Sequence, residues 1–350
     1  MNESIQKARE IITGYSGRPL RIMEVCGTHT HEIFRIGLRK LLPEAVDLIS
    51  GPGCPVCVTA VGFIDEACWL ALEKGCVVCT FGDLIRVPGT EMSLAGARAK
   101  GAEVRPVYSP LDAVELAKND PGRQYVFLAV GFETTTPSAC IAAEKAKAEG
   151  LNNFSLLTAN KTMPNAYNAL VGSADAFLYP GHVNAITGNA ACKKLCEEKG
   201  VSGVVAGFTA SELMTALAVC IKLLDRGEPF FKNCYPRVVK DEGNPAAIRI
   251  MNEVMQPCDS EWRGLGVIPM SGMELKDDYA GFDARKKYSM PEIKGKPNPA
   301  CRCGDVLQGK CKPSDCKVFG KVCTPLHPVG ACMVSDEGAC SAYYQYSGLV

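Results

Sequence analysis

Residues 20–57 read LRIMEVCGTHTHEIFRIGLRKLLPEAVDLISGPGCPVC, and this stretch decides the fold. The apolar run at 20–25 predicts a buried strand that leads directly into a polar loop at 26–31. Apolar residues then recur at helical spacing over 31–42, and 46–57 repeats the pattern of a strand followed by a cysteine-containing loop. A strand, a helix and a second strand in this order predict a parallel α/β arrangement.

The same alternation of strands and helices continues to residue 226. A second series, similar in style to the first, starts with the apolar strand in 124–137 and has predicted helices at 138–149, 164–172, 188–199 and 209–225. We therefore predict two Rossmann-like parallel-sheet units, residues 14–123 and 124–226. Two such units side by side leave a cleft at the carboxyl ends of their strands, where sheets of this kind bind ligands.

The sequence changes in character after residue 226. Proline, glycine and charged residues become frequent, one helix is predicted at 244–255, and an irregular stretch extends to Pro299. From Cys301 onward there is little periodicity, so this segment is expected to depend on bound metal for its order. We predict a small, irregular and helical C-terminal iron-sulfur domain over 227–350.

Composition argues against several classes of function. Hydrophobic residues make up 47% of the 350 residues, but no apolar run reaches the roughly 18 residues that span a bilayer. The first fifteen residues lack the features of a secretory signal, so we expect a cytoplasmic protein without a membrane role. Lys plus Arg equals Asp plus Glu at 38 each, which leaves no basic excess for nucleic acid. No G-x-x-x-x-G-K-[ST] loop and no G-x-G-x-x-G after a strand supports nucleotide binding.

Nineteen cysteines are many for a chain of this size. In a reducing compartment they favour metal binding or redox chemistry over structural disulfides. Several lie in apolar or helical contexts and are interpreted as buried filler: Cys68, Cys76, Cys79, Cys140, Cys192, Cys196 and Cys220. The tail, in contrast, has seven cysteines in a proline- and glycine-rich context: Cys301, Cys303, Cys311, Cys316, Cys323, Cys332 and Cys340.

Four of the tail cysteines have spacings that suit a metal cluster. Cys316, Cys323, Cys332 and Cys340 follow the pattern C-x6-C-x8-C-x7-C, which is looser than the paired C-x2-C of zinc ribbons. An all-sulfur ligand set of this kind favours a [4Fe-4S] cluster, with zinc as the alternative. Either cysteine of the Cys301-x-Cys303 pair could supply one of the four ligands instead.

Two loops that follow strands contain the other candidate residues. Cys54 and Cys57 form a C-x-x-C pair in a Gly-Pro-Gly loop, which favours a redox dithiol over half of a zinc site. Cys26 precedes His29 and His31, and a cysteine near histidine can be a nucleophile or an open-site metal ligand. The two histidines could equally cap the next helix or bond backbone carbonyls.

Three further polar segments fall at strand ends. Glu133 lies in G-F-E-T-T-T-P at 131–137, where it could bind a polar ligand or cap the helix that follows. The segments 160–164 and 179–183 lie in similar positions and are expected to line the same cleft.

Several motifs together resemble one known family. They are MEVCGTHTH at 23–31, GPGCPVCVT at 51–59, VGFETTTP at 130–137, PGHV at 180–183 and CTPLHPVGACMVSDEGACSAYY at 323–344. The combination closely resembles the HypD family of hydrogenase maturation proteins over nearly the whole chain. Cys311 has no counterpart in the family's pattern and is left out of the ligand set.

The resemblance implies a scaffold for assembly of the Fe(CN)2CO group of [NiFe] hydrogenases. The scaffold would act with a small HypC-type chaperone and accept cyanide from a HypE-type donor. Cys26 would hold the mononuclear iron together with a cysteine of the chaperone, and Cys54 and Cys57 would exchange electrons with the C-terminal [4Fe-4S] cluster. His29 and Glu133 would orient groups or handle protons near that iron. The alternative is a stand-alone, cluster-dependent thiol-disulfide oxidoreductase.

Overall fold

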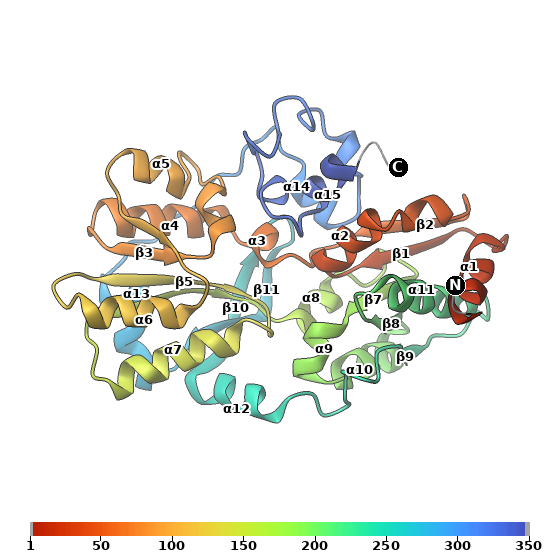
Figure 1. Cartoon of the computed structure of the whole chain (residues 1–350), viewed down its shortest axis with the longest axis horizontal. Coiled ribbons are helices and arrows are strands. Elements are labelled where there is room, and N and C mark those ends of the chain that lie inside the picture. Colours follow the sequence, from red (N-terminus) through yellow and green to blue (C-terminus); the bar gives the residue numbers. More distant parts are fainter. Residues whose placement is uncertain (1–2, 347–350) are drawn as a thin grey trace.

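The computed structural model describes residues 3–346 and contains two parallel sheets that lie side by side along its long axis (Figure 1). The first sheet has the strand order β2 (Val46–Ser50), β1 (Leu20–Glu24), β7 (Ala176–Pro180), β8 (Ser202–Ala206) and β9 (Phe231–Asn233). The second sheet has the order β4 (Val104–Pro106), β3 (Val77–Thr80), β5 (Tyr125–Gly131) and β6 (Phe154–Asn160). Every pairing within these sheets is parallel, which confirms the predicted α/β class.

The two sheets do not follow the expected units 14–123 and 124–226. Strand β1 pairs with β7 in the register Ile22 to Ala176, so the first sheet joins the start of the chain to strands beyond residue 175. The chain leaves this sheet after β2, builds the whole second sheet, and then returns. A division at residue 123 is therefore incorrect for the sheets, because strand pairing over such a distance leaves no mark on local periodicity.

Helices surround both sheets and cover most of the expected segments. Those associated with the first sheet are α1 (Glu3–Thr13), α2 (Gly27–Arg35), η1 (Leu38–Leu41), α8 (Met163–Ala169), α9 (Gly181–Thr187), α10 (Ala190–Lys199) and α11 (Ala210–Leu224). Those around the second sheet are α3 (Pro55–Val58), α4 (Val61–Leu72), η2 (Gly82–Arg86), α5 (Leu94–Ala99), α6 (Pro110–Asn119), α7 (Thr136–Ala148), α12 (Pro245–Val254), η3 (Asp277–Phe282) and α13 (Ala284–Lys287).

The helix after β1 differs from the prediction of 31–42. Helix α2 begins at Gly27, directly after the strand, and a short 3₁₀ helix η1 follows its end at Arg35. Gly37 separates the two with φ of 66°, a conformation that glycine adopts without strain. The cysteine loop is therefore a strand-to-helix junction, and Cys26 is the residue that begins the helix.

Residues 227–299, expected to be largely irregular, include a β-hairpin. Strands β10 (Met255–Trp262) and β11 (Gly266–Leu275) pair antiparallel and pack against β6 and α8. Trp262 is fully buried and stacks on Phe132 at 5.8 Å between ring centroids. The expected C-terminal domain therefore starts later than 227, because β9 and this hairpin belong to the α/β body. The hairpin was missed because its exposed face is polar and one strand contains Pro257.

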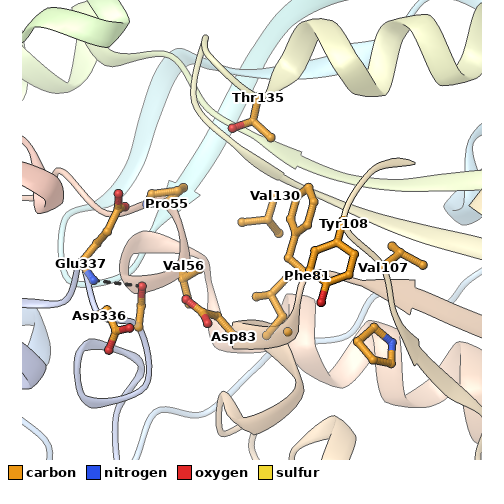
Figure 2. A pocket seen from close by; sticks show the side chains of 14 residues that line it. Pro55, Val56, Phe81, Asp83, Val107, Tyr108, Val130, Thr135, Asp336 and Glu337 are labelled. Atoms are coloured by element: carbon orange, nitrogen blue, oxygen red, sulfur yellow. Dashed lines mark hydrogen bonds between the residues drawn. The ribbon is translucent and has the colours of Figure 1, made fainter. Parts of the chain in front are cut away.

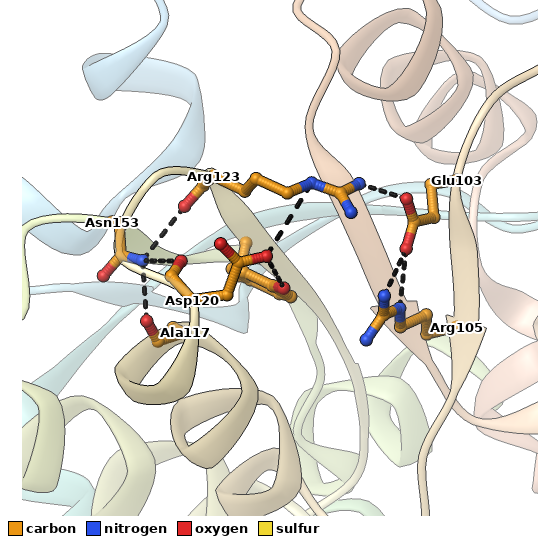
Figure 3. A network of polar contacts seen from close by, with 7 residues as sticks. Glu103, Arg105, Ala117, Asp120, Arg123 and Asn153 are labelled. Atoms are coloured by element: carbon orange, nitrogen blue, oxygen red, sulfur yellow. Dashed lines mark hydrogen bonds and ion pairs between the residues drawn. The ribbon is translucent and has the colours of Figure 1, made fainter.

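The amino ends of the second sheet are held by a network of polar contacts (Figure 3). The Asn153 side-chain nitrogen lies 2.8, 3.1 and 3.0 Å from the carbonyl oxygens of Ala117, Asp120 and Arg123. Arg123 also pairs with Glu103, a partly exposed contact of the kind that contributes little to stability. These residues lie at the opposite end of the strands from the cysteine loops, so they fix the sheet rather than the site.

The cysteine-rich tail forms a separate lobe above the two sheets (Figure 1). Its helices are α14 (Cys303–Leu307), η4 (Pro313–Asp315), η5 (Ala331–Met333) and α15 (Ala339–Tyr346). One continuous core cluster extends from the first sheet through Cys57 and Trp262 to Cys303 and Cys332 in the tail. The tail is thus packed against the body and shares its core. Within residues 3–346, no helix is long and apolar enough to cross a membrane.

Candidate functional site

The two cysteine loops lie against each other at the carboxyl ends of β1 and β2. The Gly27 amide donates to the Gly53 carbonyl at 3.0 Å, which joins the loop of Cys26 to the loop of Cys54. A Cβ at Gly27 would come within 3.2 Å of the Cys54 Cβ and 2.5 Å of the Glu337 carbonyl oxygen. Three segments therefore meet at this point: both predicted loops and, from the tail, residues 335–338.

Cys26 is buried at the start of α2, with an exposed fraction of 1%. Burial raises the pKa of its thiol far above the ordinary value, partly offset by the backbone amide of His29. The side chain is therefore a neutral thiol in the absence of a metal. A soft cation that binds there would displace the proton.

Cys54 and Cys57 form a disulfide across the first turn of α3, with Cα atoms 5.2 Å apart. Pro55 occupies the first helical position, where its missing N–H leaves no bond unmade. The exposed fractions of Cys54 and Cys57 are 2% and 0%. A bulky client protein therefore has no direct access to this pair.

His29 bonds a carbonyl of the first sheet instead of capping the helix. Its Nε2 lies 3.0 Å from the Gly207 carbonyl oxygen, and its Nδ1 is buried without a partner. Burial is the main cause that lowers the pKa of His29, to about 3, and the nearby His182 lowers it further. The imidazole is neutral, and because Nε2 must donate to the carbonyl, Nδ1 carries a free lone pair. Phe208 packs against the rings of both histidines.

His31, the other candidate of the loop, contacts the tail. Its Nδ1 lies 3.2 Å from the Asp336 carbonyl oxygen, and its Nε2 lies 3.3 Å from the hydroxyl of Tyr346. Both ring nitrogens therefore have partners in the tail. We interpret His31 as a structural contact between α2 and α15.

Glu133 is buried after β5 and has one unused carboxylate oxygen. Its Oε1 accepts the Met163 amide at 2.8 Å, whereas Oε2 has no partner. Burial raises the pKa of Glu133 to about 7. The carboxyl group therefore binds the first amide of α8 and not the start of α7, the helix that follows the motif, and its free oxygen leaves the predicted binding of a polar ligand open.

Tyr167, on α8, is a residue that the sequence did not single out. Its hydroxyl is buried without a partner, and burial raises its pKa strongly, with further contributions from the charges of Cys192, Glu133, Tyr179 and Cys26. Tyr167 thus shares one low-dielectric region with Cys26 and Glu133. A tyrosine in an apolar helix gives no signal of this role, because only the packing of α8 brings it there.

Unpartnered buried polar atoms gather around these loops. Within the described residues they include His29 Nδ1, Glu133 Oε2 and the hydroxyl of Tyr167. Buried polar groups in native proteins are nearly all bonded, so a concentration of unbonded ones marks a place where a ligand or partner completes the site.

The four predicted ligands, Cys316, Cys323, Cys332 and Cys340, line one small cavity together with Cys301 and Cys303. Cys303 Sγ and Cys332 Sγ are 2.7 Å apart. Two sulfurs on one tetrahedral metal, each about 2.3 Å from it, lie roughly 3.7 Å apart. Cys332, one of the predicted ligands, is therefore too close to Cys303 for both sulfurs to bind one metal as they stand, and it also contacts Cys340.

The remaining sulfur residues of this cavity are Cys301, Cys316, Cys323 and Cys340. Four thiol side chains that line one cavity could supply the sulfur ligands of a soft metal centre. Within residues 3–346, no group of three or more His, Cys, Asp or Glu side chains is gathered closely enough to hold an ion as it stands. Cys311 lines a different cavity beside Arg21 and Asp47.

A cleft of about 590 Å³ opens beside the Cys54–Cys57 disulfide (Figure 2). One wall comes from the carboxyl ends of β3 and β4, including Phe81 and Tyr108, and the other from Val56 next to Cys57 and from Glu337 of the tail. The predicted cleft at strand ends is therefore present. It lies between the second sheet and the tail, and not simply between two sheets. The segments 160–164 and 179–183 lie outside it: Lys161 lines another cavity, and His182 packs on Phe208.

Comparison with known proteins gives consistent matches over the whole chain. A family model described as "HypD: Hydrogenase formation hypA family" matches residues 2–347. The hydrogenase maturation factor HypD of Escherichia coli (strain K12) is 45% identical, with 94% of this chain and 90% of that protein aligned. HypD of Rhodobacter capsulatus is 42% identical over 98% of this chain and 94% of its own length. A putative hydrogenase expression/formation protein of Methanocaldococcus jannaschii is 43% identical over 93% and 92%. The chain belongs to the HypD family.

Proposed function

We propose that this protein acts in hydrogenase maturation as a scaffold that holds a mononuclear iron at Cys26 while cyanide and carbon monoxide are attached to it. The single observation that carries this proposal is the meeting of Cys26, the Cys54–Cys57 pair and the tail at one buried point. The names of the aligned relatives supply the context of hydrogenase maturation.

Iron is the cargo in this proposal. Iron(II) that carries cyanide and carbonyl is a soft centre, which thiolates hold well. Cys26 supplies one thiolate, and a cysteine of a small HypC-type chaperone supplies a second. The unpartnered polar atoms of His29, Glu133 and Tyr167 support this location, because an arriving ligand would give them the partners they lack.

We propose that the Cys54–Cys57 pair exchanges electrons during ligand attachment at the iron. A HypE-type protein delivers the cyanide. Reduction of this disulfide breaks one S–S bond and takes up two electrons and two protons. Helix α3, which carries Cys57, packs against η5, which carries Cys332. Exchange with the Cys303–Cys332 dithiol would leave Cys54 and Cys57 as thiols and join Cys303 to Cys332.

The tail is proposed to hold a [4Fe-4S] cluster through Cys301, Cys316, Cys323 and Cys340. This set takes Cys301 in place of Cys332 of the predicted ligands, because the Cys332 Sγ lies 2.7 Å from the Cys303 Sγ. When bound, the cluster would supply electrons one at a time. The fold would hold Cys303 and Cys332 between the cluster cavity and α3, on the path between the cluster and the Cys54–Cys57 pair.

The test is a pair of matched cysteine variants. Cys26→Ala should abolish hydrogenase maturation in cells and remove the infrared bands of iron-bound cyanide and carbonyl from the complex copurified with the HypC-type chaperone. Cys220→Ala, which removes an equally buried thiol from α11, should leave both unchanged. Full maturation with Cys26→Ala would overturn the proposal.

The same variants test the alternative function, a stand-alone thiol-disulfide oxidoreductase. That function requires only the dithiol, so Cys26→Ala should then leave disulfide reduction and its output intact. The burial of Cys54 and Cys57 favours the scaffold, because a client disulfide must reach the attacking sulfur.

A further inference from the structure

A second large cleft, of about 610 Å³, is lined in part by the tail and is not used by the proposed scaffold. Residues 86–93, 296–299 and 326–329 form its walls, together with Val61 and Arg263. Its charged residues are Arg86, Arg263 and Lys296, with Glu91 as the single carboxylate. We refer to it as the basic groove.

The positive charge of the basic groove is not neutralised by the protein. Arg86 donates to the Pro325 carbonyl at 2.8 Å, and Arg263 Nε donates to the Thr59 carbonyl at 2.9 Å. Arg263 Nη2 is buried with no partner at all. Within the described part of the chain, neither arginine nor Lys296 forms an ion pair, unlike Arg302, which pairs with Asp305.

The charge around the groove contrasts with the rest of the chain. The lining of the groove carries a net charge of +2, three cations (Arg86, Arg263 and Lys296) minus Glu91, although the whole chain is neutral. A single-sign surface of this kind steers an oppositely charged partner and speeds its association.

The wall of the groove contacts two residues that are proposed as cluster ligands, one through its sulfur and one through its backbone. The Val329 amide donates to Cys323 Sγ at 3.3 Å, and the Asn298 carbonyl accepts the Cys301 amide at 3.0 Å. Val329 and Asn298 both line the groove. A protein seated there would therefore be separated from the cluster cavity by one layer of residues.

The groove also offers an apolar contact. Leu326, which lines it, has an exposed fraction of 83%, and Val322 nearby in the chain has 65%. Charged residues around a small apolar centre are the usual composition of a transient protein interface.

We propose that the basic groove is the docking site of a small acidic one-electron carrier protein that reduces the tail cluster. The inference rests on the proposed function, because it names the electron donor of the cluster. In each encounter the carrier's reduced centre loses one electron and the cluster gains it, with no bond made or broken. Two encounters supply the pair of electrons that reduces one disulfide.

The first measurement is the rate of electron transfer from a reduced plant-type [2Fe-2S] ferredoxin to the full chain under nitrogen. The double variant Arg86→Glu/Lys296→Glu should slow this rate by about tenfold or more at low salt, and salt should slow the wild type. Lys194→Glu, an exposed charge reversal on α10, should leave the rate unchanged. Reduction by dithionite should be equal in all three proteins. An unchanged rate in the double variant, or an equal loss in Lys194→Glu, overturns the groove assignment.

The second measurement does not depend on a cluster. Binding of oxidised ferredoxin to the full chain, followed by calorimetry, should weaken about tenfold in the double variant and with added salt. If the purified chain contains no iron or sulfide, the proposed cluster fails, and this binding experiment still decides the groove. If neither charge reversal nor added salt changes the affinity for ferredoxin, the docking site is contradicted, even when the cluster is present.

Discussion

Gly53 lies so close to Cys26 that a Cβ on Gly53 would come within 2.2 Å of the Cys26 nitrogen and 2.3 Å of its Cα. The two cysteine loops therefore touch through their backbones and not only through side chains. Only glycine leaves room for this contact. The distance between the proposed iron ligand and the dithiol is thus set by the backbone.

Replacement of Gly53 by alanine should separate the two loops. Because backbone atoms cannot yield as a flexible side chain can, we expect Gly53→Ala to lower the free energy of unfolding by about 1–3 kcal/mol or more and to abolish maturation. Gly281→Ala is the control, since no atom lies within 4 Å of its Cβ position. Urea unfolding and hydrogenase activity of the cells provide the measurements, and equal behaviour of the two variants would contradict this view of the site.

The bond between Thr28 and Glu337 ties the Cys26 loop to the tail. Thr28 Oγ1 donates to Glu337 Oε1 at 2.7 Å. Thr28→Val removes the donor from a half-buried carboxylate that lines the cleft, which should cost about 1 kcal/mol and speed hydrogen exchange of the α15 amides. Glu337→Gln retains an acceptor oxygen, so its effect should be smaller. If exchange in α15 is as slow in Thr28→Val as in the wild type, this bond does not hold the tail.

The two possible cluster ligand sets predict opposite results for two serine variants. Cys332→Ser should keep nearly the wild-type content of iron and acid-labile sulfide, because the proposed ligand set leaves Cys332 in contact with Cys303 and not on the cluster. Cys301→Ser should lose most of both, since an alcohol is a poor substitute for thiolate. Anaerobic purification followed by iron and sulfide analysis gives the answer, and the reverse pattern would restore Cys332 to the ligand set.

Glu133 should make stability depend on pH. Its pKa is raised from 4.5 to about 7 by burial. Between these pH values the folded state keeps a proton that the unfolded state has released, so the free energy of unfolding falls as pH rises, by about 3 kcal/mol. Glu133→Gln should remove this fall. Urea unfolding at pH 5 and pH 7.5 measures it, and an equal pH dependence in the variant and the wild type would assign the effect to other groups.

Much of the site could be predicted from the sequence because its signals are local. The strands β1 and β2 are short apolar runs, and the cysteines follow them directly, so strand ends place Cys26 and the Cys54–Cys57 pair at one sheet edge. Parallel neighbours end at the same edge, and β1 and β2 are neighbours. The convergence of the two loops therefore follows from local pattern and a general rule of sheet geometry.

The rest depended on contacts between residues distant in the sequence. Nothing near residue 22 indicates that β1 pairs with β7, and the spacing of the tail cysteines does not reveal that Cys303 faces Cys332. Tyr167 joins the site only because α8 packs beneath it.

The sequence by itself determined the α/β class, the strand-to-loop junctions that bear the cysteines, and the family, because each depends on short-range patterning or on motifs read in order. Tertiary structure alone decided which strands share a sheet, which tail sulfurs come together, and that the tail contacts the Cys26 loop through Glu337. The physical reason is that these contacts arise from burial of apolar surface by the whole chain, and the free energy of that burial has no counterpart in any single segment.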